Sequence, residues 1–197
     1  MEEFVSEEVA PPSAPGEAEH PALALANSAV ALPGGHTADL LGSPAKAEQW
    51  LARRGLAPDG AGLAEVCATQ LRSLREQIRS LLASRVAEQP ALPAAITAIN
   101  EAMTRVPTAS LLLWDEKNGP YRATPHPTTA IVEHALAAIA TDAADLLTSP
   151  DAARLTACAS PPCNRFLLKH GRRQWCSTRC GDRARAARAY ARRTATG

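Results

Sequence analysis

Five cysteines occur in the 197-residue chain, and four of them lie close together near its C-terminal end. They form two short pairs, Cys158 with Cys163 and Cys176 with Cys180. Zinc binds four thiolates in a tetrahedron, and a ligand set made entirely of cysteine is typical of a structural site. We therefore predict one structural Zn2+ ion on these residues, with a zinc–thiolate redox switch as the alternative. Cys67, on an apolar helix face, is expected to be an inert core residue.

The rest of the sequence indicates that these thiols lie in a reducing compartment. Residues 1–8 are acidic, where a secretory signal would be positively charged. No apolar run approaches the ~18 residues that span a bilayer. We therefore expect a cytoplasmic protein without a membrane segment, in which clustered cysteines bind metal rather than form disulfides.

The two parts of the chain differ in charge. Residues 1–150 carry 10 Lys/Arg and 18 Asp/Glu, whereas residues 151–197 carry 11 Lys/Arg and 2 Asp/Glu. A basic end indicates a polyanion, and we expect DNA, because arginine forks match phosphate oxygens and the guanine edge. A solvated charged face or a protein partner is the alternative. The predicted nucleic-acid contacts are Lys169, Arg172, Arg173, Arg179, Arg183, Arg185, Arg188 and Arg192.

The segment between the cysteine pairs is expected to form a hairpin. Residues 165–169 and 172–175 flank His170 and Gly171, and glycine supplies the backbone angles of a tight turn. We expect His170 to be exposed in this turn rather than to bind the metal. Residues 158–163, which include two turn-forming prolines, are expected to form a zinc knuckle. This knuckle, followed by the hairpin and by a helix near Cys180, would give a treble-clef-like zinc finger. Because the module has few apolar side chains, metal binding should supply most of its folding free energy.

Arginine and alanine occupy different faces of this last helix. Arg185, Arg188 and Arg192 recur at helical spacing and form a charged ridge. The small residues of the other face, which would permit close packing, are Ala184, Ala187 and Ala191.

The rest of the chain is expected to be mainly α-helical. Apolar residues make up 46% and aromatic residues 4% of the chain, a balance that suits helices packed through Ala, Leu, Val and Ile. We interpret residues 1–20 as a disordered acidic tail, residues 21–150 as a helical domain with one small β-hairpin, and residues 151–197 as the zinc finger. Helices are expected over the apolar segment Leu23–Leu32, from Ser43 to near Gly55, over about 60–87, from Pro93 and over 128–147, and the hairpin over 111–124.

The helix at 60–87 has the clearest apolar repeat. Its expected inward residues are Leu63, Val66, Cys67, Leu71, Leu74, Ile78, Leu81 and Leu82, and its expected solvent face is Arg72, Arg75, Glu76 and Arg79. In the following helix we expect Ile96, Ile99 and Met103 to point inward.

Residues 172–185, with Trp175-Cys176-Ser177 followed by Cys180-Gly181-Asp182-Arg183, resemble the CGNR zinc finger, a bacterial C-terminal module. The resemblance implies that the four cysteines are its zinc ligands. Asp182 departs from the usual Asn, and a carboxylate there would repel phosphate. The upstream residues are similar to the ABATE domain that commonly precedes this finger, through Leu23–Ser28, Asp39-Leu40-Leu41 and Trp50-Leu51. Relatives of this kind are regarded as stress-induced transcription regulators.

Three classes of function remain after these observations. The first is a bacterial transcription regulator whose finger binds DNA and whose helical domain senses a signal or mediates assembly, for example as a homodimer. A small-molecule pocket in that domain would involve Trp114, Tyr121, His126 and His134. The second is an adaptor whose finger binds a protein or RNA. We expect no enzyme and no catalytic residue, because the sequence has no Ser/His/Asp set at readable spacing, phosphate-binding glycine loop or His-Glu-x-x-His motif.

Overall fold

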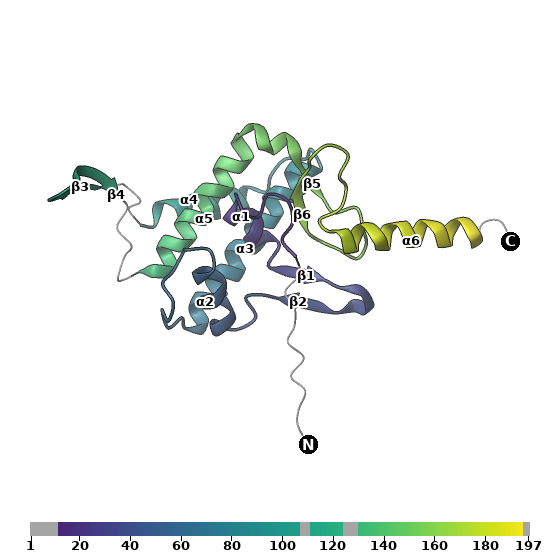
Figure 1. Ribbon diagram of the computed structural model, residues 1–197, viewed down its shortest axis with the longest axis horizontal. Helices are drawn as coiled ribbons and strands as arrows, with labels where there is room; N and C mark the ends of the chain where they lie inside the picture. The colour runs from purple at the N-terminus through teal and green to yellow at the C-terminus, as the bar shows by residue number, and fades with distance from the viewer. Residues whose placement is uncertain (1–11, 107–110, 124–129, 195–197) are drawn as a thin grey trace, which may run out of the picture.

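The computed structural model describes residues 12–106, 111–123 and 130–194. They form a helical body with the zinc module at one end and a β-hairpin at the other (Figure 1). The helices are α1 (Pro21–Ala26), α2 (Pro44–Ala52), α3 (Glu65–Val86), α4 (Pro93–Thr104), α5 (Ile131–Thr148) and α6 (Thr178–Thr194), with 3-10 turns η1 (Pro33–Gly35) and η2 (Pro150–Arg154). The strands β1 (Ala29–Ala31) and β2 (Thr37–Asp39), β3 (Leu111–Asp115) and β4 (Gly119–Ala123), and β5 (Leu155–Ala157) and β6 (Phe166–Leu168) form three antiparallel pairs. The predicted mainly α fold is confirmed.

The core lies where α1, α3, α4 and α5 pack together, with α2 against α3. Leu71, Ile78 and Leu82 of α3 are fully buried, as their spacing predicts. Two inward assignments are wrong, since Val66 is 63% exposed and Ile96 is 46% exposed. The buried faces of α3 and α4 instead begin at Ala68 and Ala95, and these faces leave Val66 and Ile96 outside. The side chains of Val66 and Ile96 therefore take no part in the packing between the helices, whereas Ala68 and Ala95 do.

The segment 23–32, expected to be helical, ends its helix early and continues into the β1–β2 hairpin. Asp39 closes this hairpin and pairs with Arg75 of α3, with Nη1–Oδ1 at 2.7 Å and Nη2–Oδ2 at 3.1 Å. Arg75, expected on the solvent face of α3, is therefore buried. Burial by itself would raise the pKa of Asp39, but hydrogen bonds from Arg75 and from the Leu41 amide lower it overall.

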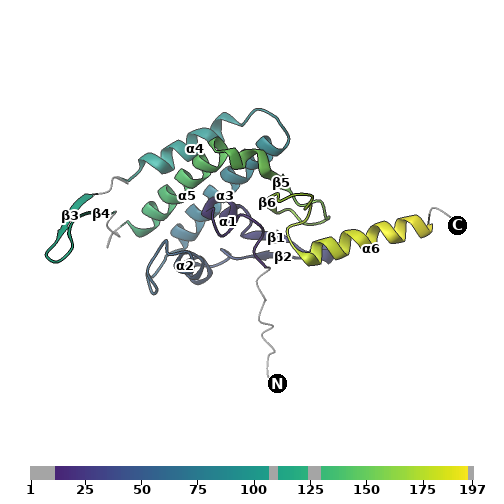
Figure 2. The same cartoon turned by 45° about the horizontal axis from the view of Figure 1, so that its top comes forward.

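The β3–β4 hairpin lies at the end of the body opposite the zinc module in both views (Figures 1 and 2). It forms where the sequence predicts it, and the Asp115 carboxylate accepts hydrogen bonds from the backbone amides of Lys117 and Asn118 in the turn. Leu112 and Trp114 on this hairpin are 73% and 75% exposed.

The zinc module pairs its strands differently from the prediction. β6 pairs with β5, which precedes the first cysteine pair, and residues 172–175 form no strand. Leu155, Phe166 and Leu168 from these strands are buried in the same cluster as the body helices. The predicted pairing is wrong because β5 and β6 gain a shared apolar core by packing against α1 and α3. The finger hairpin is thus anchored in the body.

Part of the expected disordered tail is also ordered. Within residues 12–20, Ala14 and Glu17 are buried, and the Leu168 amide donates to the Pro15 carbonyl at 2.8 Å. His20 lies with Nδ1 2.9 Å from a carboxylate oxygen of Asp142 in α5. The tail interpretation is wrong for these residues, because they bury side chains against the body and the finger. Residues 1–11 lie outside the described part of the chain.

Gly16 provides a test of this N-terminal contact. It has φ +94°, and an added Cβ would lie 2.6 Å from Cγ of Leu168 and 2.9 Å from Cδ2 of Leu23. Gly60 has a similar φ of +73° with no atom near the added Cβ, so Gly60→Ala is a matched control. We expect Gly16→Ala to lower the free energy of unfolding by about 2 kcal/mol more than Gly60→Ala, measured by urea denaturation, because of overpacking. Equal losses would show that residues 12–20 do not pack on β6.

Candidate metal centre and basic helix

The four predicted cysteines are brought together by strand β5, the turn that follows it and the start of helix α6. Cys158 follows β5, Cys163 ends the knuckle between β5 and β6, Cys176 precedes α6 and Cys180 lies in the first turn of α6. Their four sulfur atoms all lie within 4.8 Å of one another. Three of these residues are buried and Cys163 is half-buried. Cys67, in contrast, lies on α3 against the helical core.

The sulfur separations fit one shared metal ion. Sγ of Cys176 lies 3.6 Å from Sγ of Cys163 and 3.5 Å from Sγ of Cys180. A Zn–S bond of about 2.3 Å in a tetrahedron places sulfurs about 3.8 Å apart, whereas a disulfide requires about 2.05 Å. With four thiolates and no open position, the zinc ion is structural.

The sulfurs lie close enough for their thiols to hydrogen-bond to one another when no metal is bound. Hydrogen bonds from Cys163 and Cys176 lower the pKa of Cys158, and the same interactions raise the pKa of Cys163 and of Cys176. A zinc ion displaces these protons when it binds, so metal affinity depends on pH.

Backbone and arginine donors surround the sulfurs. The Cys176 amide donates to Sγ of Cys158 at 3.4 Å, and Arg183 Nη2 donates to Sγ of Cys180 at 3.2 Å. Arg165 Nη1 lies 3.9 Å from Sγ of Cys176. Four thiolates carry more negative charge than Zn2+ neutralises, and these two guanidinium groups offset the difference.

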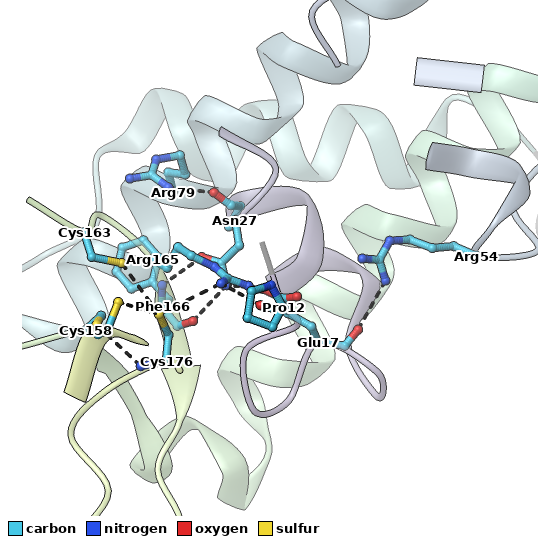
Figure 3. Close-up of polar contacts among 12 residues, drawn as sticks. Pro12, Glu17, Asn27, Arg54, Arg79, Cys158, Cys163, Arg165, Phe166 and Cys176 are labelled. Atoms are coloured by element: carbon cyan, nitrogen blue, oxygen red, sulfur yellow. Dashed lines mark hydrogen bonds and ion pairs between the residues drawn. The ribbon is translucent and has the colours of Figure 1, made fainter. Parts of the chain in front are cut away.

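A buried polar network joins this centre to the body (Figure 3). Arg165, 3% exposed, donates from Nη2 to Oε1 of Glu17 at 2.6 Å and from Nη1 to the Pro12 carbonyl at 2.8 Å. Asn27, after α1, donates to the same Glu17 oxygen at 2.7 Å and exchanges two 2.8 Å bonds with the backbone of Phe166. Burial by itself lowers the pKa of Arg165, but the Glu17 carboxylate raises it overall. The zinc module is therefore fixed to the body by a charged pair out of solvent.

Beyond its first turn, α6 extends away from the body (Figures 1 and 2). Cys180 and Gly181 are its buried residues among those that the structure describes. Gly181 permits close contact with Trp175, since an added Cβ would lie 3.3 Å from the indole ring. Arg185 and Arg188 lie over that ring at 5.9 and 5.5 Å from its centroid. Trp175 therefore holds two arginines on one face of the helix.

The predicted nucleic-acid contacts divide into two groups. Exposed positions are Lys169, Arg172, Arg173, Arg179, Arg185, Arg188 and Arg192. Arg183 is half-buried and bonds to Ser160 as well as to Cys180, so its guanidinium supports the metal centre instead of facing solvent. Asp182 is exposed and forms an ion pair with Arg185, which offsets part of the charge of this carboxylate.

The predicted small-molecule pocket is not assembled from its described members. Trp114 and Tyr121 are exposed on the β3–β4 hairpin, and His134 lies on α5. His126 falls outside the described residues. Sequence reasoning also missed Glu17 and Arg165, whose charges are separated by more than half of the chain and leave no local pattern.

Comparison with protein families matches residues 19–150 to ABATE, described as "putative stress-induced transcription regulator", and residues 154–193 to the CGNR zinc finger. The two matches meet at η2, just before the strands that enter the shared core. None of the curated proteins matches the chain. Among the described residues, no helix combines the length and apolar character needed to cross a membrane.

The Arg183 contact predicts a specific effect on the metal. We expect Arg183→Gln to weaken zinc binding about tenfold in competition with a chelator, because groups that bond to metal ligands typically contribute 10–100-fold to affinity. Arg179→Gln removes the same charge from an exposed position one turn away and should leave affinity unchanged. Equal weakening in both variants would mean that net charge, and not the bond to Cys180, supports the zinc.

Proposed function

Because the chain belongs to the ABATE family and ends in a CGNR zinc finger, we propose that it is a DNA-binding transcription regulator. The observation that carries this proposal is α6, which extends away from the body (Figure 1) and carries exposed arginines beyond its first turn. A helix of this width fits the major groove of DNA, and exposed arginines match phosphates and guanine edges.

The geometry around Trp175 supports a role in binding over a role in solubility alone. Arginines that only solvate a surface need no fixed orientation, whereas Arg185 and Arg188 are both held over one indole ring. Ordering long side chains before binding reduces the entropy lost in the complex. Arg173 extends this arrangement, since its Nε donates to the Trp175 carbonyl at 3.0 Å.

In this proposal, zinc positions the helix and the helical body receives a signal or mediates assembly. The anchoring of β6 in the body core would let a change in α1 or α3 reach the finger. We place the protein in the cytoplasm, where thiols stay reduced, and propose no catalytic role for it.

A protein-binding finger is the second candidate, and the other face of α6 favours it. Ala187 and Ala191 are exposed, and Tyr190 is 65% exposed, so this small apolar face has no partner within the described chain. Aromatic residues of this kind are common at protein interfaces.

DNA binding can be tested through its salt dependence in a mobility-shift titration with genomic fragments. If six basic residues contact phosphates, log K should fall with log salt at a slope of about −5. Arg188→Gln should reduce the slope by about 1, because one phosphate contact is lost. Lys117→Gln, in the exposed turn of the β3–β4 hairpin at the end of the body opposite the zinc module (Figure 1), removes the same charge and should change nothing.

Chelation links this binding to the metal. Zinc removal should abolish the shift, because the arginines would lose their common orientation. A finger that retains no DNA at low salt but copurifies with a protein partner would contradict the DNA proposal and favour the adaptor.

A further inference from the structure

A cavity of about 290 Å3 lies between the N-terminal segment, α1, α2 and the start of β6. Its polar lining residues are Ser13, Glu17, Asn27, Trp50, Arg53, Arg54 and Arg165, and Ala24 and Leu40 add apolar wall. Of the residues predicted for a small-molecule pocket, the three that the structure describes, Trp114, Tyr121 and His134, do not line it. The cavity is also distinct from the metal centre, although it shares Arg165 with the surroundings of Cys176.

Two buried hydrogen-bond donors along this cavity have no partner. Across the described residues, the buried side-chain nitrogen and oxygen atoms that lack one are Trp50 Nε1 and Arg165 Nε. Trp50 is 5% exposed and Arg165 is 3% exposed. A buried donor without an acceptor is unfavourable for folding, and both atoms belong to residues that line one cavity. This coincidence indicates a missing acceptor.

Two acceptors of the lining are already used within the protein. Oε1 of Glu17 accepts from Asn27 and from Arg165, and Oδ1 of Asn27 accepts from the Phe166 amide. Positive charge, in contrast, is in excess, since Arg165 already pairs with Glu17, the single carboxylate of the lining, and the lining holds no second carboxylate for Arg53 and Arg54. Arg54 lies over the face of the Trp50 ring, 4.7 Å from its centroid, so a guanidinium contacts the lining residue whose indole N–H is unpaired.

We propose that this cavity binds a small organic carboxylate. The carboxylate oxygens would accept from Trp50 Nε1 and from the arginines, and the organic portion would lie along Ala24 and Leu40. A bare oxyanion would satisfy the charge but not the apolar wall, and water would satisfy the donors but not the excess charge. The inference rests on the cavity alone, so it stands whether or not the finger binds DNA.

Arg165 gives such a ligand a direct connection to the zinc module. The same guanidinium borders the cavity, pairs with Glu17 and lies beside the sulfur of Cys176. A carboxylate bound at the unpaired Nε of Arg165 would therefore contact the same guanidinium that pairs with Glu17 and borders the metal centre.

The Trp50 indole N–H is a reporter for the site in the full, zinc-loaded chain. Its resonance in a 1H–15N spectrum can be assigned among the three tryptophans with Trp50→Phe. Sodium benzoate, sodium succinate, sodium phosphate and sodium chloride would be titrated separately at constant ionic strength. We expect benzoate or succinate to shift the Trp50 signal saturably, while the Trp114 signal on the distant hairpin stays unchanged.

Arginine variants identify the groups responsible. Arg54→Gln should weaken the carboxylate affinity about tenfold or more, as expected for a charge-assisted hydrogen bond, and Arg85→Gln should not change it. Arg53→Gln, at an exposed position of the wall, gives a second variant if Arg54→Gln unfolds. The proposal is overturned if neither carboxylate shifts Trp50, if phosphate alone or chloride does so, or if removing Arg54 or Arg53 leaves affinity unchanged. DNA binding measured on the same samples reports separately on the regulator proposal.

Discussion

Mutual repulsion among four closely spaced thiolates is the constraint on which the C-terminal module depends. Cys158, Cys163, Cys176 and Cys180 come from chain segments with few apolar side chains of their own, so burial alone cannot hold them together. A divalent ion converts this repulsion into attraction and sets the position of the first turn of α6. The direction of α6 is therefore set by the positions of the Cys176 and Cys180 sulfurs, because these residues lie just before α6 and in its first turn.

The second determinant is the joint between this centre and the helical body. Strands β5 and β6 place apolar residues in the core of the body, and Arg165 reaches Glu17 and Cys176 from one buried position. A flexible linker would let the finger search for DNA independently of the body. The observed joint instead fixes the finger to the body through buried contacts, as the proposed transmission of a signal from the body to the finger requires.

Features that depend on the spacing of nearby residues could be predicted from the sequence. Features that depend on contacts between residues far apart in the sequence could not. The zinc ligands follow from two short pairs of cysteines, and the buried residues of α3 follow from apolar residues three or four positions apart. The burial of Arg75 depends on Asp39, and the order of residues 12–20 depends on β6, which lies far along the sequence. The pairing of β6 with β5 was missed for a related reason. A glycine turn favours the local hairpin, but packing on α1 and α3 stabilises the other pairing.

Zinc K-edge X-ray absorption on the pure, reduced, full-length protein tests the central claim most directly. The account predicts one zinc per chain, surrounded by four sulfur atoms at about 2.3 Å. Nitrogen or oxygen atoms in the first shell, or protein that is folded without stoichiometric zinc, would contradict it.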